Sequence, residues 1–161
     1  MEGKKTHRAL IVIGLAIFLF SLNSAFAFDK LFVVANQKSL DLAKDFLTSL
    51  NNESIPLSIV LDQYDKVKKE KYIVVLGGAK GPASVEDLIK QILTREEIQS
   101  ANQAGGKLFI KENVFEQGQV FIVFTGADET VAAEARKKSR STWWALFSKW
   151  FELETSLPMA Y

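Results

Sequence analysis

The chain has 161 residues, 48% of them hydrophobic, and its 20 basic and 19 acidic residues nearly balance. Such a balance gives no reason to expect a nucleic-acid partner, since nucleic-acid binding needs a basic surface. The chain has no cysteine and one histidine, which excludes disulfides, thiol catalysis, iron–sulfur clusters and nearly all zinc sites, and no cofactor is expected.

Residues 1–27 have the three parts of a secretory signal peptide. Three basic residues precede the apolar run of residues 9–20, and an Ala-x-Ala cleavage site ends at Ala27. We expect cleavage after Ala27; an uncleaved anchor is the weaker alternative, because a membrane span needs about 20 apolar residues. Cleavage would remove the histidine, His7, and leave residues 28–161, with 17 basic and 18 acidic residues and a formal net charge of −1.

The first half of the expected domain alternates strands with a helix. Residues 31–35 and 72–76 are continuous apolar runs, which is typical of strands buried between two layers of helices, and residues 56–61 indicate a further strand. Residues 36–52 place hydrophobic side chains at three- and four-residue steps, which predicts an amphipathic helix. The link at residues 62–71 is short for a parallel crossover, so we expect either a minimal crossover or a strand at the sheet edge.

The second half continues with helices and a hairpin. An apolar stripe at helical spacing ends at Leu93, and Thr94 with Glu97 has the spacing of a capping box for a second helix. Residues 107–114 and 119–125 flank a short glycine-containing connection, as in a β-hairpin. These elements predict a three-layer α/β domain with a mostly parallel sheet of about five strands and one antiparallel hairpin.

The predicted domain covers residues 28–135 and contains two turns that lead from a strand into a helix. Glycines between a strand and a helix start are the context in which phosphates are bound. The first turn, residues 77–81, has neither the Walker nor the dinucleotide spacing, and Pro82 provides no N–H donor, so we interpret it as a tight turn. A ligand site in this fold is expected at the strand ends, where the candidate residues are Gly77, Gly78, Lys80, Gly126 and Asp128.

The two turns, "YIVVLGGAKGP" and "VFIVFTGADET", resemble the α/β modules of archaeal surface-layer proteins and related secreted envelope proteins. The resemblance covers most of residues 31–135. It implies an envelope-associated module of binding or structural type, without catalysis and with an envelope or surface-layer protein as partner. We therefore expect an exported, non-enzymatic protein at the cell surface. The alternative is a hydrolase or small-ligand-binding domain with its site at the carboxyl ends of the strands.

Residues 136–161 form a basic, aromatic tail that contains all three tryptophans of the chain. Read as a helix, it places Trp143, Phe147, Trp150 and Phe151 on one face. This face would contact a membrane surface or a partner protein, because basic residues next to aromatic rings suit an interface. The competing and more frequent interpretation is that the face packs on the sheet.

Asn52-Glu-Ser54 is a sequon for N-glycosylation. We expect it in a loop between a helix and a strand. On an exported chain, Asn52 would be open to modification where the host has the machinery.

Overall fold

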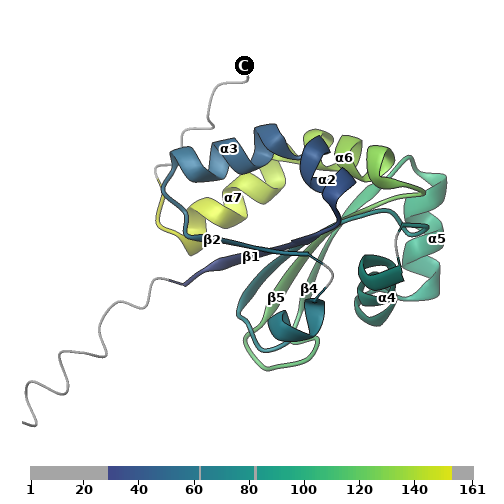
Figure 1. Ribbon diagram of the computed structural model, residues 1–161, viewed down its shortest axis with the longest axis horizontal. Helices are drawn as coiled ribbons and strands as arrows, with labels where there is room; N and C mark the ends of the chain where they lie inside the picture. The colour runs from purple at the N-terminus through teal and green to yellow at the C-terminus, as the bar shows by residue number, and fades with distance from the viewer. Residues whose placement is uncertain (1–28, 62, 82, 154–161) are drawn as a thin grey trace, which may run out of the picture.

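The computed structural model describes residues 29–61, 63–81 and 83–153, so the expected signal peptide lies outside the described residues. Within them, five strands form one mixed sheet in the order β2-β1-β3-β5-β4 (Figure 1). The strands are β1 (Leu31–Ala35), β2 (Leu57–Val60), β3 (Tyr72–Leu76), β4 (Lys107–Glu112) and β5 (Val120–Thr125). All are parallel except β4, which pairs antiparallel with β5. The predicted α/β class, the mostly parallel sheet and the hairpin are confirmed.

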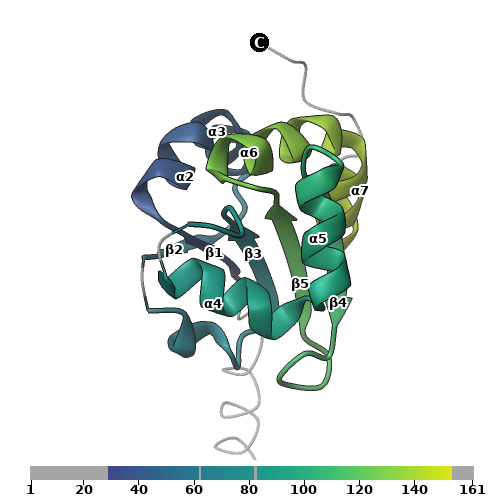
Figure 2. The same cartoon turned by 90° about the vertical axis from the view of Figure 1, so that its right-hand side faces the viewer.

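Helices cover both faces of the sheet, which gives three layers (Figures 1 and 2). One face carries α2 (Gln37–Leu42), α3 (Lys44–Asn52), α6 (Glu129–Lys138) and α7 (Arg140–Trp150). The other carries the 3-10 helix η1 (Tyr64–Val67), α4 (Ala83–Ile92) and α5 (Arg95–Gln103). A hydrophobic core lies on each face of the sheet, and successive residues of β3 point into opposite cores. Val74 packs towards α3 and α7, whereas Ile73 and Val75 pack towards α4.

The helix predicted over residues 36–52 is divided into α2 and α3 at Ala43. The Ala43 N–H donates to the carbonyl of Leu40 at 3.0 Å, three residues back instead of four, which closes α2. Asn36 caps the start of α2 by accepting a bond from the Ser39 N–H at 2.8 Å. The break allows Ala43 and Phe46 to be buried against the sheet, with exposures of 2% and 1%.

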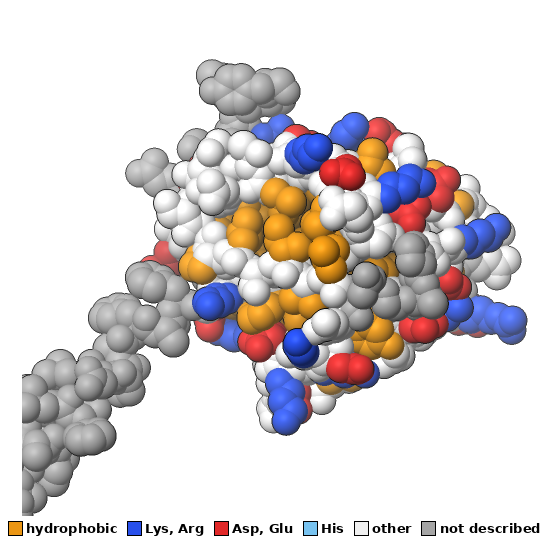
Figure 3. Space-filling model, viewed as in Figure 1, with side chains coloured by type: hydrophobic (Ala, Val, Ile, Leu, Met, Phe, Trp, Pro, Cys, Tyr) orange, Lys and Arg blue, Asp and Glu red, His pale blue; other side chains and the backbone are white. Residues whose placement is uncertain are grey.

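The short link between β2 and β3 is a minimal parallel crossover, and β2 is also an edge strand, so both expected alternatives are present. The link passes β1, which lies between the two strands, and its only helical element is η1. Val67 of η1 is fully buried in the core beneath it. At the β2 edge Ile59 and Leu61 are 49% and 43% exposed, and Figure 3 shows hydrophobic side chains gathered on the face of the molecule that includes this edge.

The capping box predicted from Thr94 and Glu97 is present at the start of α5. The Glu97 N–H donates to the Thr94 hydroxyl at 3.2 Å, and the Thr94 N–H donates to the Glu97 carboxylate at 2.9 Å. Two otherwise unpaired backbone donors are thereby satisfied, which defines where α5 begins. None of the helices within the described ranges has the length and apolar character that crossing a bilayer requires.

The last helix, α7, belongs to the same core as the strands. Trp143 and Phe147 are buried, and their rings lie 5.0 and 6.2 Å from the ring of Phe46, centroid to centroid. Trp150 stacks on Tyr72 of β3 with 4.6 Å between ring centroids. The boundary expected after residue 135 falls inside α6, which continues to Lys138. Both α6 and α7 pack on this sheet together with α2 and α3.

Candidate functional site

The two glycine turns meet at the carboxyl ends of β3 and β5, and we call residues 77–81 and 126–129 the strand-end corner. A Cβ atom added to Gly78 would lie 2.5 Å from the Cα and the carbonyl carbon of Asp128, so the two backbones touch. The Ala79 N–H donates to the carbonyl of Gly126 at 2.8 Å. The structure thus brings Gly77, Gly78, Gly126 and Asp128 together, and a backbone donor that a phosphate would need is used within the protein.

The cavity found beside the strand-end corner is small, and the polar side chains of the corner are bonded or exposed. The Asp128 carboxylate caps α6 by accepting a bond from the Val131 N–H at 3.0 Å, and Lys80 extends into solvent. The cavity beside Gly77 and Phe124 has a volume of about 10 Å³. Such a volume holds about one water molecule. Among the described residues, the corner is therefore a packed junction between two turns.

The strand-end corner contains a buried carboxylate that the sequence analysis missed. Glu129, 7% exposed, accepts bonds from the Asn36 amide at 3.1 Å and from the Lys38 ammonium at 3.2 Å. Burial raises the pKa of Glu129, but bonds from its own backbone N–H, Lys38 and Asn36 outweigh that effect and lower the pKa below 4.5. Two features of the sequence could have indicated the bond from Asn36 to Glu129: the acid directly follows Asp128, and the amide directly follows the first strand.

We expect Glu129→Gln to lower the free energy of unfolding by about 1–2 kcal/mol at pH 7, because bonds to an ionised group are stronger than neutral ones. Since folding lowers the pKa of Glu129, its contribution is complete above pH 4.5 and is lost as the pH falls below that value. Urea denaturation of both proteins between pH 3 and 7 measures the difference. A difference that is equal at both ends of this range would contradict the assignment.

A larger cavity of about 360 Å³ opens between α3 and the junction of α6 with α7, and we call it the α3–α6 cavity. Figure 1 shows α3 lying beside both helices on the same face of the sheet. Four basic side chains line the cavity with a single acidic one, Asp45; they are Lys44, Arg136, Lys137 and Arg140. Thr48, Ser49 and Asn52 of α3 add polar groups to the wall.

Arg136 forms the inner wall of the α3–α6 cavity and is only 2% exposed. Its guanidinium donates to the carbonyl of Leu42 at 2.8 Å and to the carboxylate of Asp45 at 3.0 Å, and it lies over the ring of Phe46 at 5.2 Å. Burial raises the pKa of Asp45. The hydrogen bond from Arg136 and the charge of Arg136 lower this pKa by more than burial raises it, so the net shift is downward. Asp45 is therefore ionised at neutral pH and fixes Arg136.

The remaining predicted site residues lie in two settings. Trp143 and Phe147 are buried, and Trp150 and Phe151 are partly buried against Tyr72, so these side chains pack within the domain. Asn52 is the last residue of α3 and is exposed, at the wall of the α3–α6 cavity instead of in a loop. The cavity itself was not predicted, since its basic residues come from segments about 90 positions apart.

These observations define a three-layer α/β domain with a packed strand-end corner and an open basic cavity. Comparison of the chain with protein-family models, with curated proteins and with solved structures found no match. The resemblance to surface-layer modules therefore stays a prediction.

Proposed function

We propose that this chain is an exported, non-enzymatic module with a binding or structural role at the cell envelope. The observation that supports it most is the closure of the strand-end corner by its own backbone. Open α/β sheets usually hold their ligands at the carboxyl ends of the strands. Here Gly78 touches Asp128 at that place, and the adjacent cavity is only about 10 Å³ in volume. The corner then joins two structural turns, and binding is left to the outer surface.

The proposed location at the envelope depends on the N-terminal pattern. Residues 1–27 combine basic residues, an apolar run and an Ala-x-Ala site, which are the features that direct a chain to export. The resemblance of the two glycine turns to envelope modules points to the same place. The location is therefore tested by an experiment on cells.

A small-ligand or hydrolase domain with its site at the strand ends is the second candidate. One observation favours it: Glu129 is a buried carboxylate with a lowered pKa, and such groups gather at functional sites. The partners of Glu129 nevertheless suit a structural role, because Asn36 and Lys38 lie at the start of α2 and tie it to α6. We therefore rank this candidate second.

Cell fractionation tests the proposed location. The protein should be found outside the cytoplasm, be cut by protease on intact cells, and begin at Phe28 when its N-terminal peptide is sequenced by mass spectrometry. A variant lacking residues 9–20 should stay in the cytoplasm. Crosslinking of intact cells should then join the exported protein to an envelope component. Recovery of the wild-type chain in the cytoplasm with residues 1–27 intact would overturn the proposal.

A further inference from the structure

We propose that the α3–α6 cavity binds oxyanions, namely the phosphate or carboxylate groups of a saccharide polymer of the cell envelope. The envelope source of the ligand rests on the proposed function, whereas oxyanion binding rests on the cavity alone. The cavity volume of about 360 Å³ falls within the range of about 300–1,000 Å³ that is usual for ligand sites. The cavity beside Gly77 and Phe124 on the same face has a volume of only about 10 Å³.

The positive charge of the cavity is a local feature. Four basic side chains and one acidic side chain line it, although basic and acidic residues almost cancel over the whole sequence. A general excess of lysine therefore does not explain the cluster. Concentrating cations around a concave surface raises the local concentration of anions and strengthens their binding.

Three of the four cations have carboxylate partners in the structure, and the two lysine pairs are exposed at the surface. Arg136 is held by Asp45, so it supports the wall and contributes little net charge. Lys44 and Lys137 form ion pairs with Asp41 and Glu134 at 3.5 and 3.0 Å, and all four of these side chains are half-exposed or more. Exposed ion pairs of this kind contribute little free energy, so a ligand anion can replace the carboxylate at low cost.

The rest of the wall carries polar groups that suit a saccharide, and a hydrogen bond joins two of its helices. Thr48 and Asn52 offer hydroxyl and amide groups that can bond to sugar hydroxyls. The indole N–H of Trp143 donates to the carbonyl of Arg136 at 3.0 Å, which joins α7 to α6 at the cavity. A preformed wall loses little conformational entropy when a ligand binds.

The test is calorimetry on the purified protein with three probes of similar length: an oligomer of glycerol phosphate, an oligogalacturonate and neutral dextran. We expect at least one anionic probe to bind, more weakly at higher salt, and dextran not to bind. The double variant Lys44→Gln, Lys137→Gln should weaken binding by about tenfold or more, because two cations at the opening are lost.

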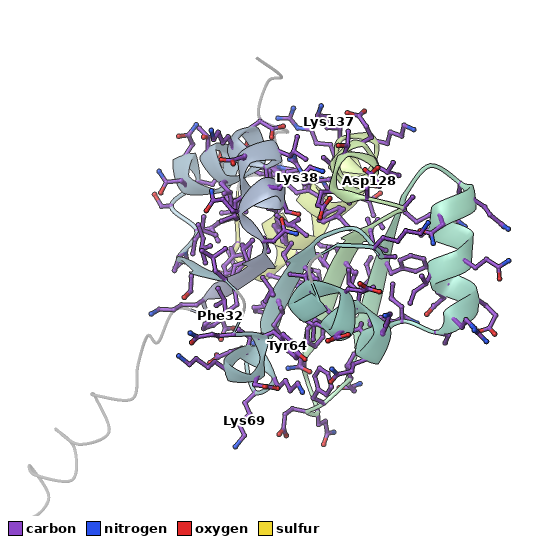
Figure 4. The ribbon with its side chains drawn as sticks, turned by 45° about the vertical axis from the view of Figure 1, so that its right-hand side comes forward. Phe32, Lys38, Tyr64, Lys69, Asp128 and Lys137 are labelled. Atoms are coloured by element: carbon purple, nitrogen blue, oxygen red, sulfur yellow. The ribbon has the colours of Figure 1, made fainter. Side chains whose placement is uncertain are left out.

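A matched variant separates a site from a general effect of charge. Lys66→Gln with Lys69→Gln removes two positive charges from exposed side chains near η1; Figure 4 shows Lys69 at the end of the molecule opposite Lys137. This variant should change the affinity less than twofold. All the lysines concerned are solvent-exposed or paired at the surface, so both variants should fold, and circular dichroism checks this.

Binding of one anionic probe only identifies phosphate or carboxylate as the ligand group, and binding of both shows that charge is the main requirement. Equal weakening by the two double variants, equal binding of dextran, or failure of both anionic probes would overturn the inference. A cytoplasmic protein that binds the anions would instead overturn only the proposed location.

Discussion

Replacing Phe147 by alanine is expected to lower the free energy of unfolding by about 3–5 kcal/mol, the range for removing a buried phenylalanine side chain. Phe147 has no exposed surface and contacts the rings of Phe46, Trp143 and Trp150. Alanine would leave a cavity between α7 and the sheet that these rigid rings cannot close. The loss is large because the ring is part of the main core on this face.

Urea or thermal denaturation measures this effect, with Lys149→Ala as its control on the same helix. Lys149 is exposed, so its replacement should change the free energy of unfolding by no more than about 0.5 kcal/mol. If Phe147→Ala were as stable as the wild type, the ring would not be buried in solution. The interpretation of α7 as a surface for membranes or partners would then gain support.

Replacing Gly78 by alanine is expected to lower the free energy of unfolding by about 1–3 kcal/mol, as for other overpacked sites. The added methyl group would lie 2.5 Å from the backbone of Asp128, and a backbone cannot rotate away as a side chain can. The sign of the change in the free energy of unfolding shows whether the added methyl group clashes. Glycine-to-alanine changes without a clash usually stabilise a protein, by about 0.4–1 kcal/mol, because they reduce the freedom of the unfolded chain.

Denaturation of Gly78→Ala decides between a closed and an open strand-end corner. Lys80→Ala in the same turn is the control; Lys80 is exposed, and we expect a change within about 0.5 kcal/mol. An increase in stability for Gly78→Ala would show that the two turns do not touch. The corner would then have space for a ligand, which favours the second candidate function.

Local patterns predicted much of the fold. Apolar runs such as residues 72–76 and caps such as Thr94 depend on neighbours within a few positions, and the structure has them where the sequence indicates. The break at Ala43 was missed, because the apolar spacing of residues 36–52 continues through it. Periodicity reports which side of a segment is buried, and it does not report where the helix axis bends.

The tail shows a second limit of periodicity. Trp144 lies off the apolar stripe of α7, yet it is 2% exposed and its ring meets that of Trp143 at 5.7 Å. Consecutive residues on a helix point about 100° apart, so burial of both requires that α7 be covered over a wide arc. How much of the surface of α7 is buried depends on where the surrounding elements lie, and periodicity does not contain this information.

Neither candidate site could be assembled from the sequence in full, because its contacts join distant positions. The bond from Asn36 to Glu129 spans 93 positions, and the bond from Arg136 to Asp45 spans 91. No spacing rule links residues so far apart. The glycines were found because turn chemistry is local, whereas the α3–α6 cavity exists only once α3 lies beside α6 and α7.

An NMR titration locates binding most directly. Amide shifts of the ¹⁵N-labelled protein would be followed as the anionic probe that binds in calorimetry is added. We predict that the shifted amides cluster at residues 44–52 and 136–143, around the α3–α6 cavity, while residues 77–81 and 126–130 stay unchanged. Shifts concentrated at residues 77–81 and 126–130 would contradict the account and make the strand-end corner the binding site.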